Sequence, residues 1–187
     1  YYSNGSFEKS IAAYQEAIRK HPLDKDNPRL MSTIVEAYYR LRQPDEAAKV
    51  QEQMIKAFGP GSAWRKANQD EPEAISNADK LAKQALYTAA VRHHTLAQRL
   101  KKEGEVEQAR AEYARAAEVY ADYLSRFSDS RDAYKLTFYL AECYYYSLDF
   151  EKAAQTYSWV RDSTVSKEFL ADADNSVVLS YEHIAKQ

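Results

Sequence analysis

The sequence predicts an all-α protein in which antiparallel helical hairpins stack into a solenoid. Helix-breaking residues are sparse, with four Gly and five Pro among 187 residues, while strong helix formers are plentiful. An apolar pattern with helical spacing also recurs along the chain, in two alternating kinds of helix. Because a single hairpin cannot bury its own apolar side, recurring hairpins are expected to cover one another.

One kind of helix follows a turn and repeats the same order of residue types. An apolar residue is followed by a small residue, then by a Tyr, and then by a second small or apolar residue, always at the same spacing. This order occurs at residues 7–17, 106–116 and 150–160, and Pro44 opens a weaker copy. We interpret these segments as the second helices of hairpins.

The other kind of helix precedes each copy, and its apolar positions end in Tyr or Leu. The terminal anchors are Tyr1, Tyr38, Leu100, Tyr144 and Tyr181. The step from Tyr38 to Leu100 is the longest of the series, so an insertion is expected there, and the Gly- and Pro-containing segment 59–74 supplies it. We interpret the anchored segments as first helices.

This alternation resembles the tetratricopeptide repeat (TPR), a hairpin repeat with small, aromatic and Ala positions in its second helix. The matching residues are Ser10, Tyr14, Ala17 and Pro22. No Trp opens a first helix, and Arg42 and Leu148 stand where a turn Gly is usual. The resemblance implies a right-handed TPR-like α-solenoid, here with unusually long helices and one insertion.

We expect one TPR-like array over residues 1–187, which we interpret as part of a longer protein. Its predicted parts are a partial repeat 1–22, a repeat 28–58, the insertion 59–74, a long-helix repeat 75–127, a repeat 131–161 and a partial repeat 166–187.

Local signals predict the first helix boundaries. Asn27 is expected to cap a helix whose first turn holds Pro28, and Pro44 is expected to begin the next helix. Within the insertion, Ser62 is expected to cap a short helix that ends near Ala67.

Further along, Pro72 is expected to open a long helix that ends near Lys102, and Gly5 and Gly104 are expected at tight turns between helices. The helix that follows, 106–127, is predicted to bury one continuous side. That side comprises Ala109, Tyr113, Ala116, Ala117, Tyr120, Leu124 and Phe127.

The chain contains sixteen Tyr residues, a number that needs a structural explanation. Tyrosine rings pack between helices while their hydroxyl groups reach water or a polar partner. We therefore predict structural roles for Tyr14, Tyr38, Tyr113, Tyr144, Tyr157 and Tyr181.

Composition argues against several classes of function. The formal net charge is −2 and the pI is about 6.1, so the clustered basic surface of a nucleic-acid-binding protein is not expected. No apolar run approaches the length of roughly 20 residues that crosses a bilayer. Cys143 is the single cysteine, which excludes an internal disulfide and a CxxC metal site, and we predict that it is a buried structural thiol.

Motifs for catalysis, metals or cofactors are weak. His93 and His94 are adjacent, so on a helix they point about 100 degrees apart and do not form a chelating pair. The segment 59–62 precedes a helix, but it lacks the Gly-Lys-Ser/Thr ending of a phosphate-binding loop. We expect no enzyme activity, no metal and no cofactor.

The TPR resemblance implies that the first helices line a concave groove that holds an extended peptide or a helix of a partner. Positions offset from the anchors give one polar and aromatic stripe for each first helix. The candidate groove residues are Arg29, Ser32, Glu36, Tyr39, His94, Gln98, Lys101, Lys135, Phe138, Glu142 and Tyr145.

These expectations indicate a non-enzymatic scaffold for protein–protein interaction that binds a protein or peptide partner. Two alternatives remain: a structural segment that stacks on further repeats or self-associates, and the regulatory repeats of a larger enzyme. The residue sequences of segments 123–130, 138–142 and 150–154 are similar to those of repeats in bacterial envelope lipoproteins. The lipoproteins in question are of the outer-membrane assembly type and the Tol-Pal-associated cell-division type. That similarity implies a periplasmic or outer-membrane-associated protein, with a cytoplasmic location as the alternative.

Overall fold

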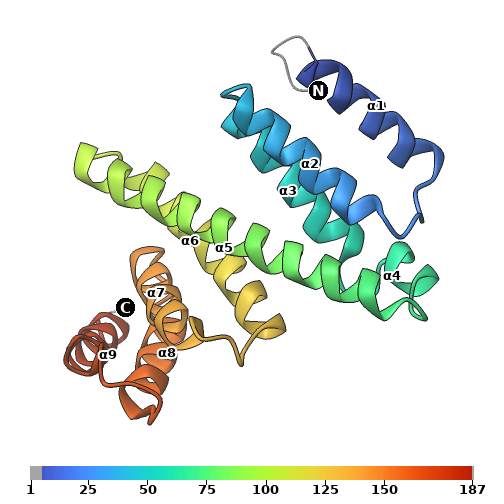
Figure 1. Ribbon diagram of the computed structural model, residues 1–187. Coiled ribbons are helices and arrows are strands. Elements are labelled where there is room, and N and C mark those ends of the chain that lie inside the picture. Colours follow the sequence, from blue (N-terminus) through green and yellow to red (C-terminus); the bar gives the residue numbers. More distant parts are fainter. Residues whose placement is uncertain (1–5, 187) are drawn as a thin grey trace. The chain divides into compact units, whose positions relative to one another are not determined.

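The computed structural model describes residues 6–186, and within this range the chain is all-α and TPR-like, with nine helices and no strand (Figure 1). The helices are α1 (Phe7–Lys20), α2 (Asn27–Arg40), α3 (Pro44–Phe58), α4 (Ala63–Ala67), α5 (Pro72–Glu103), α6 (Val106–Arg126), α7 (Ala133–Tyr146), α8 (Phe150–Asp162) and α9 (Leu170–Ile184). No helix of this range is long and apolar enough to span a membrane. The predicted anchor Tyr1 and the predicted turn at Gly5 lie outside the described residues.

The chain forms two compact units, and the boundary between them, after Leu86, falls inside α5. Unit 1 contains α1 to α4 and the first half of α5, while unit 2 contains the second half of α5 and α6 to α9. The long-helix repeat expected at 75–127 therefore contributes to both units.

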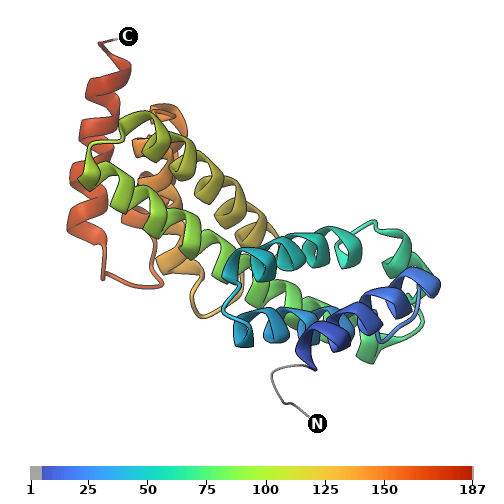
Figure 2. The ribbon, with the colours of Figure 1, turned by 90° about the horizontal axis from the view of Figure 1, so that it is seen from above.

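In unit 1, successive helices pack as hairpins, with α1 against α2 and α2 against α3 (Figures 1 and 2). The core between them is mainly aliphatic, with Ile34 and Met54 almost fully buried. Burying a side chain of this size stabilises the fold by roughly 1.5–3 kcal/mol. Helical spacing puts several such residues on one side of each helix, and their burial holds the hairpins together. Tyr14 and Tyr38 pack against this core while remaining partly exposed, as their predicted structural role requires.

The insertion belongs to the core of unit 1. Trp64 of α4 is 2% exposed, and its indole Nε1 donates a hydrogen bond of 2.7 Å to the carbonyl of Asp24. Asn68 donates from Nδ2 to the carbonyl of Leu23 at 3.0 Å. These two hydrogen bonds join the insertion to the loop between α1 and α2. Because its side chain is buried, Trp64 is not available on the surface for contact with a partner.

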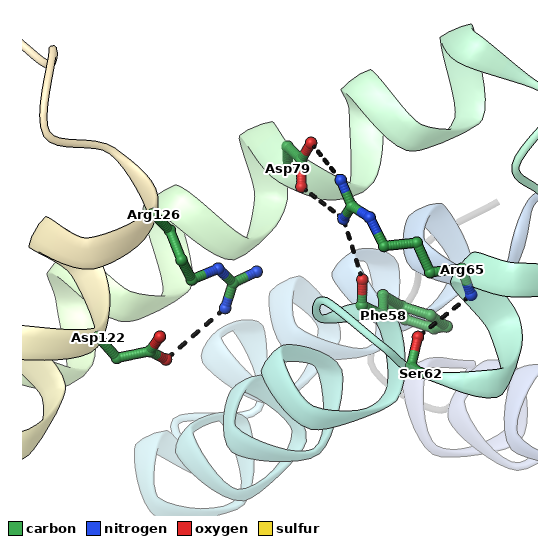
Figure 3. A network of polar contacts seen from close by, with 6 residues as sticks. All are labelled: Phe58, Ser62, Arg65, Asp79, Asp122 and Arg126. Carbon is green, nitrogen blue, oxygen red and sulfur yellow. Dashed lines mark hydrogen bonds and ion pairs between the residues drawn. The ribbon is translucent and has the colours of Figure 1, made fainter.

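An ion pair ties the insertion to the long helix. Both terminal nitrogens of Arg65 donate to the carboxylate of Asp79 in α5, at 2.7 and 2.8 Å, and Arg65 also reaches the carbonyl of Phe58 (Figure 3). Ser62 caps α4 as expected, because its hydroxyl accepts from the backbone N–H of Arg65. Two parallel bonds fix the guanidinium in one orientation and so set how α4 approaches α5.

In unit 2, α6 packs against α7, α7 against α8, and α8 against α9. The interior combines aromatic rings with aliphatic side chains, and Tyr120, Tyr123, Tyr157 and Cys143 are almost completely buried. Along α6, Asp122 and Arg126 form an ion pair one helical turn apart, at 3.6 Å (Figure 3).

Three turns between first and second helices have the same backbone geometry. Arg42, Gly104 and Leu148 have φ values of 58°, 84° and 69°, in the left-handed region that favours glycine. In each turn the next N–H donates back to the carbonyl of the anchor residue, which is Tyr38, Leu100 or Tyr144. This is the Schellman motif, and Arg42 and Leu148 adopt it without being glycine.

Three predictions about single residues were wrong. Asn27 does not cap α2; it lies buried inside the first turn and donates from Nδ2 to the carbonyl of His21. Tyr123, rather than Leu124, lies on the buried side of α6. Tyr181 is 56% exposed, because none of the described residues covers that side of α9. The buried states of Tyr113 and Tyr157 and of the Cys143 thiol were confirmed.

Candidate partner-binding face

In unit 1, the candidate residues lie along one side of α2. Arg29, Glu36 and Tyr39 are exposed, Tyr39 to 46%, and Ser32 is partly buried. Their spacing of three and four residues places them in one row. The ring of Tyr39 is already exposed, so a partner could contact it without any change in the packing of the core. This row is available for contact with a partner.

In unit 2, the candidate residue His94 of α5 is a core residue. It is 6% exposed and its ring meets those of Tyr113, Tyr120 and Tyr139 edge-on at 5.6–5.9 Å. Gln98 donates to its Nε2 at 3.2 Å, which leaves the Nδ1–H to donate to the hydroxyl of Tyr120 at 3.3 Å. Burial lowers the pKa of His94 to about 4, so the ring is neutral and its role is structural.

Phe138 of α7 is also an interior residue. It is 8% exposed, its ring stacks on that of Phe169 with centroids 4.3 Å apart, and it meets Tyr157 edge-on. Tyr145 is partly buried and packs against Phe150 and His183. These two residues therefore face α8 and α9, and the predicted stripe on α7 combined two different sides of the helix.

The side of α7 that is directed toward α5 carries Lys135, Tyr139, Glu142 and Tyr146, which follow each other at helical spacing. Lys101 of α5 lies with its Nζ 3.5 Å from the centre of the Tyr146 ring, and Lys135 lies 5.5 Å from that of Tyr139. Tyr139 and Tyr146 were missed from the sequence. A helical wheel continued from Lys135 in steps of four would have found Tyr139.

Glu142 has unusual surroundings for a carboxyl group on a helix. It is partly buried, and among residues 6–186 its carboxyl group has no hydrogen bond and no ion pair. Burial and, to a smaller extent, the nearby charge of Asp172 raise the pKa of Glu142 to about 7, against an opposing effect of Lys101. Glu142 therefore carries a partial charge near neutral pH.

We call these groups the unit 2 face, defined as Lys101, Lys135, Tyr139, Glu142, Tyr146 and Asp172. They come from α5, α7 and α9 and combine two cations, two acids and two aromatic rings. Among the described residues no group of His, Cys, Asp and Glu side chains could hold a metal ion. Burial raises the pKa of the Cys143 thiol, which makes it a poor nucleophile. The arrangement is suited to holding side chains of another molecule by charge and ring contacts.

A comparison with protein families supports the repeat assignment. A family model described as tetratricopeptide repeat matches residues 1–63, about a third of the chain, which includes α1, α2 and α3. No curated protein matches the chain.

Proposed function

We propose that this chain is a non-enzymatic scaffold that binds a peptide or a helix of a partner protein along its first helices. Tetratricopeptide repeats generally mediate protein–protein interactions, and residues 1–63 match that repeat. The observation that carries the proposal is the unit 2 face, where charged and aromatic side chains of three first helices are brought together. Tyrosine in such a place supplies a large contact area at a low cost in side-chain entropy.

The experiment is capture of partners by the immobilised chain from extract of the cells that make it. We expect Tyr146→Ser in the unit 2 face to lose a partner while keeping its helicity by circular dichroism. Tyr181→Ser is the matched control, because it makes the same change on an exposed position of α9. Tyr39→Ala tests the α2 row in the same way. Capture that survives both Tyr146→Ser and Tyr39→Ala would overturn binding along the first helices.

A second candidate function is stacking on another repeat or another copy of the chain. On α9, Val178 and Tyr181 are 54% and 56% exposed. The equivalent positions of α7 in the repeat pattern are Ala141, which is fully buried, and Tyr144, which is partly buried. An apolar side that is covered in one repeat and open in the next supports stacking.

Light scattering of the chain at increasing concentration tests this second function. Stacking predicts a rise in mass that Tyr181→Ser abolishes and Tyr146→Ser leaves intact. Tyr146→Ser is the test variant for partner binding and the control for stacking, and Tyr181→Ser is the reverse. The variant that has an effect therefore shows which function the chain performs. If the measured mass equals that of one chain at every concentration, the chain does not self-associate.

An envelope location is part of the proposal and rests only on the resemblance of residues 123–130, 138–142 and 150–154 to repeats of envelope lipoproteins. Capture from separate envelope extracts, periplasm included, and cytoplasmic extracts tests it. Enrichment of the Tyr146-dependent partner in the cytoplasmic extract would favour the cytoplasmic alternative.

A further inference from the structure

The Glu142 carboxyl group lies at the unit 2 face without a bonding partner of its own. Every helix of unit 2 places a group near it: Lys101 from α5, Tyr113 and Tyr120 from α6, Cys143 from α7, Tyr157 from α8 and Asp172 from α9. None of these groups, nor any other described residue, forms a hydrogen bond or ion pair with it. A partly buried carboxylate in this state is costly, and a cation of opposite charge would relieve the cost.

The rings beside Glu142 are already arranged to hold a cation. The ammonium of Lys101 lies 3.5 Å from the centre of the Tyr146 ring, and that ring packs at 5.0 Å against the ring of Tyr113. Cations are attracted to the faces of aromatic rings within about 6 Å of the centroid. Lys135 shows the same relation to Tyr139. The face therefore accepts ammonium groups within the chain itself.

The charges around Glu142 are not balanced. Its two charged neighbours are Asp172, which adds negative charge, and Lys101, whose ammonium is drawn onto the Tyr146 ring. When Glu142 is ionised, two carboxylates share the influence of one ammonium. The complement of this arrangement is one additional positive charge carried on an apolar stem.

We propose that the partner segment bound at the unit 2 face inserts a Lys or Arg side chain beside Glu142, with its stem along the ring of Tyr146. This inference rests on the proposed function and adds the chemistry of the partner to it. Lys101 then acts as a competing cation that the partner's side chain displaces or joins.

The inference predicts a pH dependence with a definite sign. Burial raises the pKa of the tyrosines at 113, 120 and 157 and of the Cys143 thiol, so these groups remain neutral between pH 6 and 8. The pKa of Glu142, about 7, falls inside this window. The carboxyl group gains its charge as the pH rises, so the cationic segment binds more tightly at pH 8 than at pH 6.

The experiment selects random displayed peptides on the immobilised chain and measures the affinity of the best peptide by fluorescence anisotropy. We expect the selected peptides to share one Lys or Arg. Replacing that residue with norleucine or citrulline, which are neutral and of similar shape, is expected to weaken binding by about tenfold. Glu142→Gln should weaken it to the same extent and remove the difference between pH 6 and pH 8. Glu151→Gln, on an exposed position of α8, is the control and should change neither.

A second variant guards against loss of binding through misfolding. Lys101→Met removes the competing ammonium, so it should tighten binding of the cationic peptide several-fold at pH 8, a gain that a damaged fold does not produce. Selected peptides without a shared cation, or unchanged affinity in Glu142→Gln, would overturn the inference and leave the proposed function standing. Failure to select any peptide that depends on Tyr146 or Tyr39 would overturn the proposed function itself.

Discussion

At the scale of single residues, the neutral ring of His94 makes the fold sensitive to acid. Its pKa is lowered to about 4 by burial, from an ordinary value of 6.5. Because the folded-state pKa is the lower one, the stabilisation is complete above pH 6.5 and is lost as the pH falls toward 4. The shift corresponds to a loss of up to about 3 kcal/mol in the free energy of unfolding.

Urea denaturation of the wild type and of His94→Gln at pH 7.5 and pH 4 measures this effect. The amide of Gln is uncharged at both values, so the variant should lose less stability on acidification than the wild type. The same substitution at the exposed residue His21 is the control and should not alter the loss. Equal acid sensitivity in His94→Gln would show that the ring is protonated in the folded chain.

Glu142 has the opposite effect on stability. Its folded-state pKa, about 7, lies above the ordinary value of 4.5, so stabilisation is complete below pH 4.5 and is lost as the pH rises through 7. We expect Glu142→Gln to raise the free energy of unfolding at pH 8 by about 1–2 kcal/mol, after allowance for its partial exposure, and to change it little at pH 4.5.

Urea denaturation at the two pH values, with Glu151→Gln as the surface control, checks this prediction. A variant that is more stable and binds the cationic peptide less well would identify Glu142 as a residue retained for binding at a cost in stability. A loss of stability at pH 8 would instead mean that the carboxylate supports the fold.

The residues of the candidate site were only partly predictable from the sequence. Lys101, Lys135 and Glu142 were found because polar residues at helical spacing mark one side of a helix. His94 and Phe138 were misplaced onto the surface, because their burial depends on Tyr120 and Phe169, which belong to other helices. Spacing within one helix does not contain that information.

At the scale of elements, the turns at Arg42 and Leu148 are strained versions of the one at Gly104. A side chain in the left-handed region costs roughly 1–2 kcal/mol of stability. A new glycine offsets part of the gain because it raises the conformational entropy of the unfolded chain. Leu148 is 46% exposed, so its replacement loses little packing. We expect Leu148→Gly to raise the free energy of unfolding by a few tenths to about 1 kcal/mol, as measured by thermal denaturation.

The reverse substitution tests the same argument. A Cβ added at Gly104 would meet no atom within 4 Å, so Gly104→Ala isolates the backbone cost and should destabilise the chain by about 1 kcal/mol. If Leu148→Gly also destabilised the chain, the Leu148 side chain would be contributing more through packing than its backbone loses through strain.

Helix boundaries were the most predictable part of the elements. Pro44, Pro72 and Gly104 act through their own backbone. Ser62 acts through its hydroxyl, which accepts from a backbone N–H of the first helical turn. All these effects are local in the sequence, so they can be inferred without the fold. Asn27 was misjudged because its amide bonds the carbonyl of His21 in the preceding loop. The insertion was found from its length, but its attachment through Trp64 to Asp24 joins residues 40 positions apart.

At the scale of the whole chain, each unit is built from contacts between neighbouring helices, and α5 belongs to both units. In an array of this kind stability is approximately a sum of local terms, so damage to one unit is expected to spread to the other only in part. Trp64 is suited to test this because its burial and its bond to Asp24 lie wholly within unit 1.

We expect Trp64→Ala to cost unit 1 about 3–5 kcal/mol, the usual effect of removing a buried aromatic side chain. Native-state hydrogen exchange should then show faster exchange of the amides of α2, α3 and α4, while the amides of α7, α8 and α9 keep their wild-type rates. The first half of α5 should follow unit 1 and its second half should follow unit 2, so that the change in protection occurs near Leu86. Trp159→Ala, on an exposed position of α8, is the matched control and should alter neither set. A uniform loss of protection across all helices would mean that the chain unfolds as one cooperative body, with α5 transmitting the damage along its whole length.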